Sequence, residues 1–281
     1  KTGNYDLNIV KEHPLAPVFC IIQDSKDNIW AGTYFDGLYY FEMSKEGEIK
    51  KHHRFTKASG INSNIIRSVA EDADGNIWIG TDNGINQIIR GVESGENAEI
   101  ISYKHNPTDP KSLSYNYILP IFIAKNKDIW VGTLGGGLNK FIPGSTPYNG
   151  QFKRINVNDG LPSNVVKTIE EDEKGNLWLA TNHGLSKYNP NISEIVNYGI
   201  NDGLQDLEFG ELASTTLEDG EMIFGGVNGF NTFYPENITS DSSHINIVFN
   251  ALTVLNKEVI TGEKVNDRIL LQNDINRTEK V

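Results

Sequence analysis

The sequence predicts an all-β protein, a β-propeller of four-stranded antiparallel blades, and two features of the chain indicate this class. The first is a phrase that recurs five times, as DNIWAGT, GNIWIGT, KDIWVGT, GNLWLAT and GEMIFGG. Its central positions, 30, 78, 130, 178 and 223, lie 48, 52, 48 and 45 residues apart, and a fixed period of this length is typical of propellers and solenoids. The second is that short apolar runs separated by glycine-containing turns make up each copy, which is the pattern of antiparallel strands.

Composition narrows the class of protein further. The chain has 281 residues, of which 22% are charged and 38% hydrophobic, as in globular domains and unlike disordered segments. A formal net charge of −12 argues against nucleic-acid or anionic-lipid partners, which need basic patches. The apolar runs are far shorter than a membrane span. Because the sequence starts at Lys1 with no signal peptide, we expect it to be a piece of a longer protein.

Each repeat is expected to form one blade. The repeats lie near residues 11–55, 56–103, 104–152, 153–199 and 200–240. In the fourth repeat the predicted strands are 165–170, 177–181, 185–188 and 194–198. The turn EDEKGN between the first two strands contains Gly175, which adopts a positive φ without strain. Residues 5–10 can be interpreted as an outermost strand of a preceding blade.

Four tryptophans, Trp30, Trp78, Trp130 and Trp178, are predicted to be structural. A four-stranded sheet has two apolar faces and buries them only by stacking on neighbouring sheets. One large ring per blade fills that interface, and the glycine that follows allows close approach of the backbones. The single cysteine, Cys20, lies in the apolar run 18–22, so we expect a buried structural thiol and no intrachain disulfide.

The pattern changes after Pro235. Residues 244–255, HINIVFNALTVL, predict a longer strand, and a second apolar run follows at 268–271. No further copy of the repeated phrase is present in this part of the chain. We therefore expect residues 241–281 to be the start of a second β domain.

The repeats resemble the two-component regulator propeller repeat. The resemblance rests on Asn164-Val165-Val166 with Glu171-Asp172 and Gly175-Asn176-Leu177-Trp178, and on the matching residues from Ile65 to Thr81. The fifth copy, Glu208 to Asn231, resembles the terminal blade of that family, and the segment from Ile245 resembles the start of the Y-Y-Y β-sandwich. The resemblance implies the sensor region of a Bacteroidetes hybrid two-component histidine kinase, in which seven-bladed propellers precede the sandwich, a membrane helix and the kinase.

The chain departs from that family plan in the number of its blades. Five repeats are visible where a seven-bladed ring is expected, the fifth has Ile223 in place of tryptophan, and the first has HPLAP before its opening strand. Five blades of a larger ring would leave two sheet faces uncovered, so we expect either a closed five-bladed ring or a partner at the open faces.

Candidate ligand-binding residues come from the turns between the second and third strands and from the connectors between blades, which share one face of a propeller. They are Tyr34, Phe35, Asp36, Asn83, Tyr115, His183 and Asn228. Aromatic rings flanked by amides and carboxylates suit sugars, because rings stack on apolar sugar faces while polar groups bind hydroxyls. Asparagine and glycine are also ordinary turn residues, so a purely structural role for the same residues stays open.

Other chemistry receives little support from the sequence. The acidic turns at 71–76 and 171–176 lack calcium-loop spacing and are interpreted as plain turns, similar to the structural Asp-box turn. The six histidines show no metal spacing, and no cofactor is expected. No nucleophile, P-loop or dinucleotide motif is present, although a carboxylate pair for glycoside hydrolysis is not readable from sequence.

Three functions from different classes follow. The favoured one is an extracytoplasmic, periplasmic sensor module, not itself an enzyme, that recognises an oligosaccharide or relays its binding to a transmembrane histidine kinase. Its expected partners are an oligosaccharide and, in the full-length sensor, a second copy in a homodimer. The alternatives are a protein-interaction scaffold and a carbohydrate-active propeller enzyme.

Overall fold

The computed structural model describes residues 16–89, 98–238, 251–254, 257–265, 268–269 and 271. The chain divides into two compact units, Lys1–Ile238 and Thr239–Val281. In the described part of the first unit, the regular structure is β-sheet with short 3₁₀ turns of three residues. The all-β class predicted from the sequence is confirmed.

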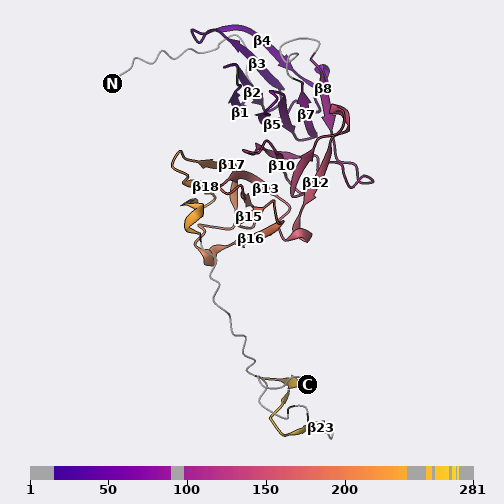
Figure 1. The fold of residues 1–281 in the computed structure, drawn as a ribbon, viewed down its shortest axis with the longest axis vertical. Helices are drawn as coiled ribbons and strands as arrows, with labels where there is room; N and C mark the ends of the chain where they lie inside the picture. Colours follow the sequence, from indigo (N-terminus) through magenta and orange to yellow (C-terminus); the bar gives the residue numbers. More distant parts are fainter. Residues whose placement is uncertain are drawn as a thin grey trace, which may run out of the picture. The chain divides into compact units, whose positions relative to one another are not determined.

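The first unit consists of five antiparallel sheets that follow one another in sequence order, as the colours of Figure 1 show. Blade 1 contains β1 (Val18–Gln23), β2 (Ile29–Thr33), β3 (Leu38–Met43) and β4 (Ile49–Phe55). Blade 2 contains β5 (Ile66–Glu71), β6 (Ile77–Thr81), β7 (Gly84–Ile88) and β8 (Ile100–Tyr103). Blade 3 contains β9 (Ile118–Ile123), β10 (Ile129–Thr133), β11 (Leu138–Ile142) and β12 (Gln151–Ile155). Blade 4 contains β13 (Val166–Glu171), β14 (Leu177–Thr181), β15 (Leu185–Asn189) and β16 (Glu194–Tyr198). Blade 5 contains β17 (Phe209–Thr216), β18 (Met222–Gly226) and β19 (Gly229–Phe233).

The fifth repeat is the exception to the four-strand prediction. Its sheet has three strands, in the order β17-β18-β19, among the residues that the structure describes. After Phe233 the chain enters the 3₁₀ turn Pro235–Asn237, where Pro235 supplies no backbone N–H for a strand ladder. The expectation of a fourth strand in this blade was wrong for the described residues.

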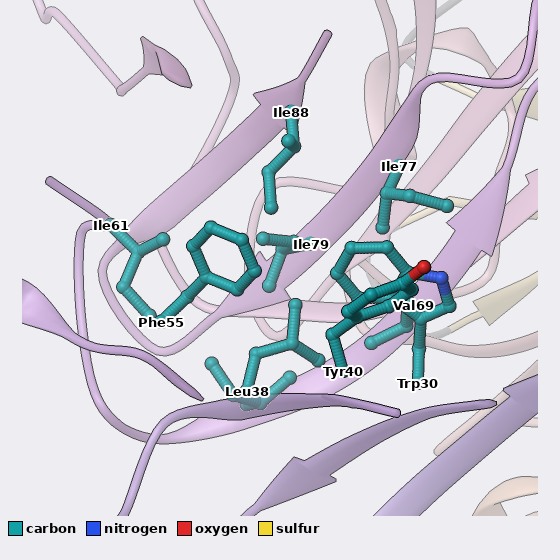
Figure 2. Packing of buried hydrophobic residues seen from close by; sticks show 10 residues of the cluster. Trp30, Leu38, Tyr40, Phe55, Ile61, Val69, Ile77, Ile79 and Ile88 are labelled. Carbon is teal, nitrogen blue, oxygen red and sulfur yellow. The ribbon is translucent and has the colours of Figure 1, made fainter. Parts of the chain in front are cut away.

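The tryptophans lie between consecutive blades, as predicted. Trp30 packs with Ile77, Ile79 and Ile88 of blade 2, and Figure 2 shows its indole facing the aliphatic side chains of that blade. Trp78, Trp130 and Trp178 lie in the same way against blades 3, 4 and 5. All four rings are at most 2% exposed. At each of the four interfaces between consecutive blades, the apolar faces that a blade cannot bury by itself are therefore covered by its neighbour.

Glycine at the second position after the tryptophan is required by this stacking. A Cβ on Gly80 would lie 2.4 Å from Oγ of Ser68 and 2.7 Å from Cγ2 of Ile118, the latter in blade 3. Gly32 and Gly132 meet equally close contacts from the blades that follow them. The predicted close approach of backbones is confirmed at these three blades, whereas Ala180 occupies the position in blade 4.

A short polar network fastens the turn between the first and second strands. In blade 2, Asp72 accepts hydrogen bonds from the backbone of Asp74 and Asn76, from the Asn76 side chain and from Nε1 of Trp78 at 2.8 Å. The same indole-to-carboxylate bond joins Trp30 to Asp24 and Trp178 to Asp172. The acidic turns are structural, in agreement with the interpretation made from sequence.

The outer face of blade 1 is open in the described part of the chain. It forms an apolar groove of about 290 Å³ lined by Val18, Ile21, Ile29, Ala31, Thr33, Tyr39, Phe41, Met43 and Ile49. Ile21 is 64% exposed, whereas Val69, at the same place in blade 2, is 7% exposed beneath blade 1. Among the described strands, blade 1 and blade 5 do not pack on each other as neighbouring blades do. These strands therefore do not close a five-bladed ring, and the expectation of a partner at the open faces stays a prediction.

The second unit is described only in short segments. It contains two hairpins of two-residue strands, β20 (Thr253–Val254) with β21 (Lys257–Glu258), and β22 (Lys264–Val265) with β23 (Arg268–Ile269). Most of the strand expected at residues 244–255 lies outside the described residues, as does the predicted N-terminal strand at 5–10. The start of a Y-Y-Y sandwich stays a prediction.

Candidate functional site

Backbone hydrogen bonds bring the turn of each blade to the connector that leads into the next blade. The N–H of a turn glycine donates to the connector carbonyl in blades 1 to 4. The pairs are Gly37 to Asn64 at 2.9 Å, Gly84 to Asn116 at 2.6 Å, Gly137 to Asn164 at 2.8 Å and Gly184 to Leu207 at 2.6 Å. The turn residues therefore lie beside the start of the next innermost strand, which places turns and connectors on one face of the propeller.

The aromatic candidates of blade 1 are in contact and accessible. The rings of Tyr34 and Phe35 lie 4.4 Å apart, edge to face, and Phe35 is 64% exposed. Phe35 adopts φ +110°, a region that costs a non-glycine residue of the order of 1–3 kcal/mol. Phe35 therefore keeps a large ring at a position where its own backbone conformation favours glycine.

Tyr115 occupies a comparable place in blade 3. It is 45% exposed, and its ring lies over Gly135, where an added Cβ would be 3.4 Å from Cζ of the tyrosine. The absence of a side chain at Gly135 makes room for this ring. Tyr115 therefore presents an accessible aromatic surface held by the turn beneath it.

The remaining candidates hold the turns together. Asp36 binds Arg54 at 2.8 Å and also accepts from the Tyr39 hydroxyl. The Nδ2 of Asn83 donates to the Asn62 carbonyl at 3.2 Å. Asn228 donates through its backbone to Gln205 at 2.8 Å and through Nδ2 to Asp206 at 2.5 Å.

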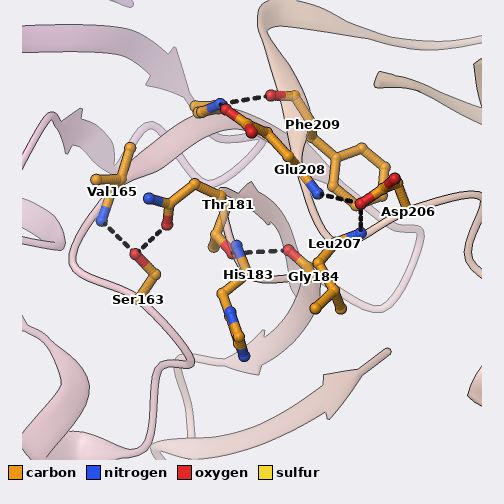
Figure 3. Close-up of polar contacts among 11 residues, drawn as sticks. Ser163, Val165, Thr181, His183, Gly184, Asp206, Leu207, Glu208 and Phe209 are labelled. Carbon is orange, nitrogen blue, oxygen red and sulfur yellow. Dashed lines mark hydrogen bonds and ion pairs between the residues drawn. The ribbon is translucent and has the colours of Figure 1, made fainter. Parts of the chain in front are cut away.

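His183 differs from these three residues because only its backbone is engaged. Its N–H donates to Oγ1 of Thr181 at 2.9 Å, and its imidazole is exposed. Figure 3 shows the imidazole directed away from the polar contacts that join this turn to the connector before blade 5. Among the polar candidates, His183 is the one whose side chain makes no hydrogen bond or ion pair with the described residues.

The residues nearest the centre of the propeller were not predicted. The ladders of β1, β5 and β13 with their partners shift register at the same place, between Val18 and Cys20, Ile66 and Ser68, and Val166 and Thr168. A β-bulge of this kind re-aims the extra residue. The bulged residues are Phe19, Arg67 and Lys167.

Arg67 lies at the meeting point of four blades. Its guanidinium carbon is 4.0 Å from the ring centroid of Phe19 in blade 1 and 5.5 Å from that of Tyr117, which precedes blade 3. Its Nη2 pairs with Glu211 of blade 5. Because Phe19 also lies 6.3 Å from Tyr34, a continuous series of aromatic contacts runs from the exposed turn of blade 1 to this cation. We call Phe19, Tyr34, Phe35, Arg67, Tyr117 and Glu211 the axial cluster.

Burial and the Arg67 cation act on the pKa of Tyr117 in opposite directions. Desolvation raises the pKa of the Tyr117 phenol above its usual value, and the nearby Arg67 cation partly offsets this effect. Tyr117 therefore remains a neutral hydroxyl at neutral pH, able to donate and accept hydrogen bonds beside the guanidinium. No group of histidine, cysteine or acidic side chains suited to a metal ion occurs within the described segments.

The sequence offered one signal for these residues that we did not use. Cations occur at the second position of two first strands, IRSVAE and VKTIEE, at the same place in the repeat. What such a cation contacts is decided by residues far along the chain, since Arg67 and Glu211 are 144 positions apart.

Comparison with known proteins agrees with the fold. Residues 14–35, 60–83 and 160–183 match the family model described as two component regulator propeller. The whole chain is 26% identical to a protein named histidine kinase P4 from Formosa agariphila, and it spans 20% of that protein's length. No helix of the described residues is long and apolar enough to cross a membrane.

Solved structures give the same result. The extracellular domain of a hybrid two-component system from B. thetaiotaomicron is 25% identical, with a TM-score of 0.58 over 78% of this chain and 34% of that one. A second such domain from the same organism is 22% identical, with a TM-score of 0.65 over 79% of this chain and 30% of that one. A virginiamycin B lyase from Staphylococcus aureus, 16% identical with a TM-score of 0.55 over 81% and 72% of the two chains, shares the fold alone.

The five stacked sheets define the chain as a β-propeller. Three of its repeats match the two-component regulator propeller family, and the chain is similar over its full length to a protein named histidine kinase P4 and over most of its length to the extracellular domain of a hybrid two-component system. The resemblance identified from the sequence is confirmed.

Proposed function

We propose that this chain forms part of the extracytoplasmic, periplasmic sensor region of a hybrid two-component histidine kinase, and that the face bearing the axial cluster binds an oligosaccharide. The similarity to an extracellular domain of such a system supports the sensor role. The relative named as a histidine kinase supports a kinase elsewhere in a longer protein, since this chain spans 20% of that relative. The carbohydrate part of the proposal rests on the site.

The observation that carries the binding proposal is the strained, exposed ring of Phe35 beside Tyr34. A large apolar ring in the left-handed region costs stability and is typical of functional positions, because surrounding structure must hold it there. Two further rings, Phe19 and Tyr115, are 40% and 45% exposed on the innermost strand and on a connector. Aromatic surfaces of this kind stack on sugar rings, while Asp36 in the turn of blade 1 and His183 in the turn of blade 4 supply polar groups.

Calorimetry with digests of polysaccharides tests the binding role. We expect Phe35→Ala and Tyr34→Ala to weaken binding about tenfold or more, in line with the loss of a well-packed aromatic contact. Tyr148→Ala is the matched control, since Tyr148 is an exposed aromatic residue, 67% accessible, on a different turn. Equal binding by all three variants would contradict the assignment of the site.

Two measurements separate the alternatives. Binding to an extracytoplasmic protein, with no glycan bound, would favour the interaction scaffold. Shortened glycan products after long incubation would favour an enzyme. The sensor proposal expects binding without turnover.

For transmission, we propose that the full-length sensor is a homodimer in which the ligand changes the arrangement of the propellers, and that the following domain passes this change to the membrane. Small-angle scattering of an intact sensor region should differ between the free and saturated states. Superimposable profiles would contradict this mechanism without affecting the binding proposal.

A further inference from the structure

Two cations at the centre of the propeller, Arg67 and Lys167, are held on regular strands, whereas their acidic partners come from an irregular segment. The side chain of Arg67 is 5% exposed and that of Lys167 is 10% exposed. Both start from regular first strands that are paired along their length, apart from the shared bulge. A buried cation needs a partner, because removing charge from water costs several kcal/mol.

Both cations take their counter-charges from one short segment of blade 5. Arg67 pairs with Glu211, and Lys167 binds Oε1 of Glu208 at 3.1 Å and the Phe209 carbonyl at 2.7 Å. Residues 208–211 therefore act as the internal anion for two cations from different blades.

This acidic segment is the least regular part of the inner strands. The pairing of β17 with β18 skips from Phe209 to Ser214, and Leu212 lies in the left-handed region with φ +54°. The carboxylate side chains are solvent-accessible, at 56% for Glu208 and 37% for Glu211. Because these carboxylates reach solvent, another anion can replace them without leaving either buried cation unpaired.

One donor of Arg67 is unpaired and becomes reachable only when Glu211 moves aside. Its Nε is buried and has no hydrogen-bond partner among the described residues, although Nη2 is paired. A carboxylate or sulfate binds a guanidinium through two parallel hydrogen bonds, which a single Glu211 contact at Nη2 does not provide. The rings of Phe19 and Tyr117 flank the guanidinium and hold its plane in place.

We propose that the axial cluster binds an acidic group of the oligosaccharide, a uronate carboxylate, through Arg67, with Lys167 as a second cation. Glu208 and Glu211 pair with these two cations until the ligand displaces them. The inference rests on the proposed function, because the aromatic rings of the same face hold the sugar. It adds the chemical class of the ligand and an internal competitor. The formal charge of −12 on the whole chain has a short reach, since exposed charges are screened over about 10 Å at 0.1 M salt.

The experiment compares uronate trimers with their methyl esters, which have the same sugar and no charge. Trimers of galacturonate, glucuronate and mannuronate are titrated by calorimetry at one fixed ionic strength. We expect at least one acid to bind about tenfold or more tighter than its ester, the range for a charge-assisted hydrogen bond. In Glu211→Gln this advantage should grow about three- to fivefold, and in Arg67→Gln it should disappear. Glu194→Gln, which removes an exposed charge from the outer strand of blade 4, is the control for net charge and should change nothing.

Thermal melting of the variants separates binding from folding. Glu211→Gln keeps an amide oxygen as a hydrogen-bond partner for Arg67 and removes only the charge, so we expect its melting temperature to fall less than that of Arg67→Gln, and its effect on affinity tests the proposal even if Arg67→Gln is unstable. Equal binding of acids and esters that still depends on Tyr34 and Phe35 would overturn the charge assignment and leave the proposed function intact. Failure of the uronate trimers and esters to bind, while a polysaccharide digest does bind, would overturn the uronate assignment alone, and failure of the trimers, the esters and the digests would overturn both. Binding of sodium sulfate alone with the affinity of the trimers would overturn the assignment to an oligosaccharide.

Discussion

The indole nitrogen of Trp78 donates a hydrogen bond of 2.8 Å to the carboxylate of Asp72, six residues earlier in the chain. This bond joins the turn between two strands to the ring that fills the interface with the next blade. The local turn and the long-range packing of a blade therefore share one residue pair, which occurs again in blades 1 and 4. In blade 3 the acceptor is replaced by Ala124, so the indole of Trp130 has no carboxylate at that position.

Removal of the turn carboxylate should destabilise the propeller. Asp72→Ala leaves the Trp78 indole and the Asn76 amide without their acceptor, and we expect a loss of about 1–3 kcal/mol in the free energy of unfolding. Urea denaturation monitored by tryptophan fluorescence measures it. Asp74→Ala, at an exposed position of the same turn, is the control and should be close to neutral. Equal midpoints for the two variants would contradict the role of the bond.

Loss of an interblade ring should cost more than loss of its hydrogen bond. Trp178 is 1% exposed and contacts Tyr198 and Phe233 at centroid distances of 5.5 and 4.8 Å. We expect Trp178→Ala to cost about 3–5 kcal/mol, the range for large core truncations. Ile192→Ala, where the side chain is 68% exposed, is the control. An unchanged denaturation midpoint for Trp178→Ala would remove the packing argument.

A glycine at position 127 should stabilise the chain. Lys127 adopts φ +72° in the turn where blades 2 and 4 place Gly75 and Gly175, with φ +80° and +76°. A left-handed conformation costs a non-glycine residue about 1–2 kcal/mol, part of which is offset by the larger unfolded-state entropy of glycine. We expect Lys127→Gly to raise the free energy of unfolding by about 0.5–1 kcal/mol, measured by thermal melting. The reverse change Gly75→Ala should lower it, and a gain there would contradict the reasoning.

Cys20 should react slowly with alkylating agents in the folded state. Burial raises the pKa of its thiol to about 11, from 9.0, with a smaller lowering from its hydrogen bond to Gly32 and from the charge of Arg67. The thiolate is the reactive form, so at pH 8 its population is about a hundredfold lower than in the unfolded chain. Iodoacetamide labelling followed by mass spectrometry measures the rate with and without urea. Equal rates would contradict the buried, structural role.

The same shift has a consequence for stability at alkaline pH. The folded-state pKa lies above the unfolded one, so the unfolded chain releases its proton first as the pH rises. The contribution of Cys20 is fully present below pH 9.0 and is lost as the pH approaches about 11. Cys20→Ala should flatten the decline of stability between these two pH values, and an unaltered profile would show that other groups cause it.

How far the sequence predicts this protein depends on the range of the interactions concerned. The strands of blade 4, the tryptophan interfaces and the Asp72 turn follow from contacts within one repeat or between adjacent repeats, so a period of about fifty residues is sufficient to predict them. The sequence also named Tyr34, Phe35 and Tyr115, because turn residues of successive repeats share a face. It did not show that Phe35 has a strained backbone.

The centre of the propeller required the tertiary structure. The bulges that direct Phe19 and Arg67 inward change the register of a ladder without changing the pattern of apolar residues. The repeat in the sequence therefore does not predict them. The pairing of Arg67 with Glu211 depends on how four blades curve around a common centre. The sequence by itself determined the blades and the order in which they stack, because those rest on local hydrogen bonding and repeated burial. Only the tertiary structure decided which charged side chains pair with each other. Such pairing depends on the angles between blades, which add up along the chain, and no single repeat encodes their sum.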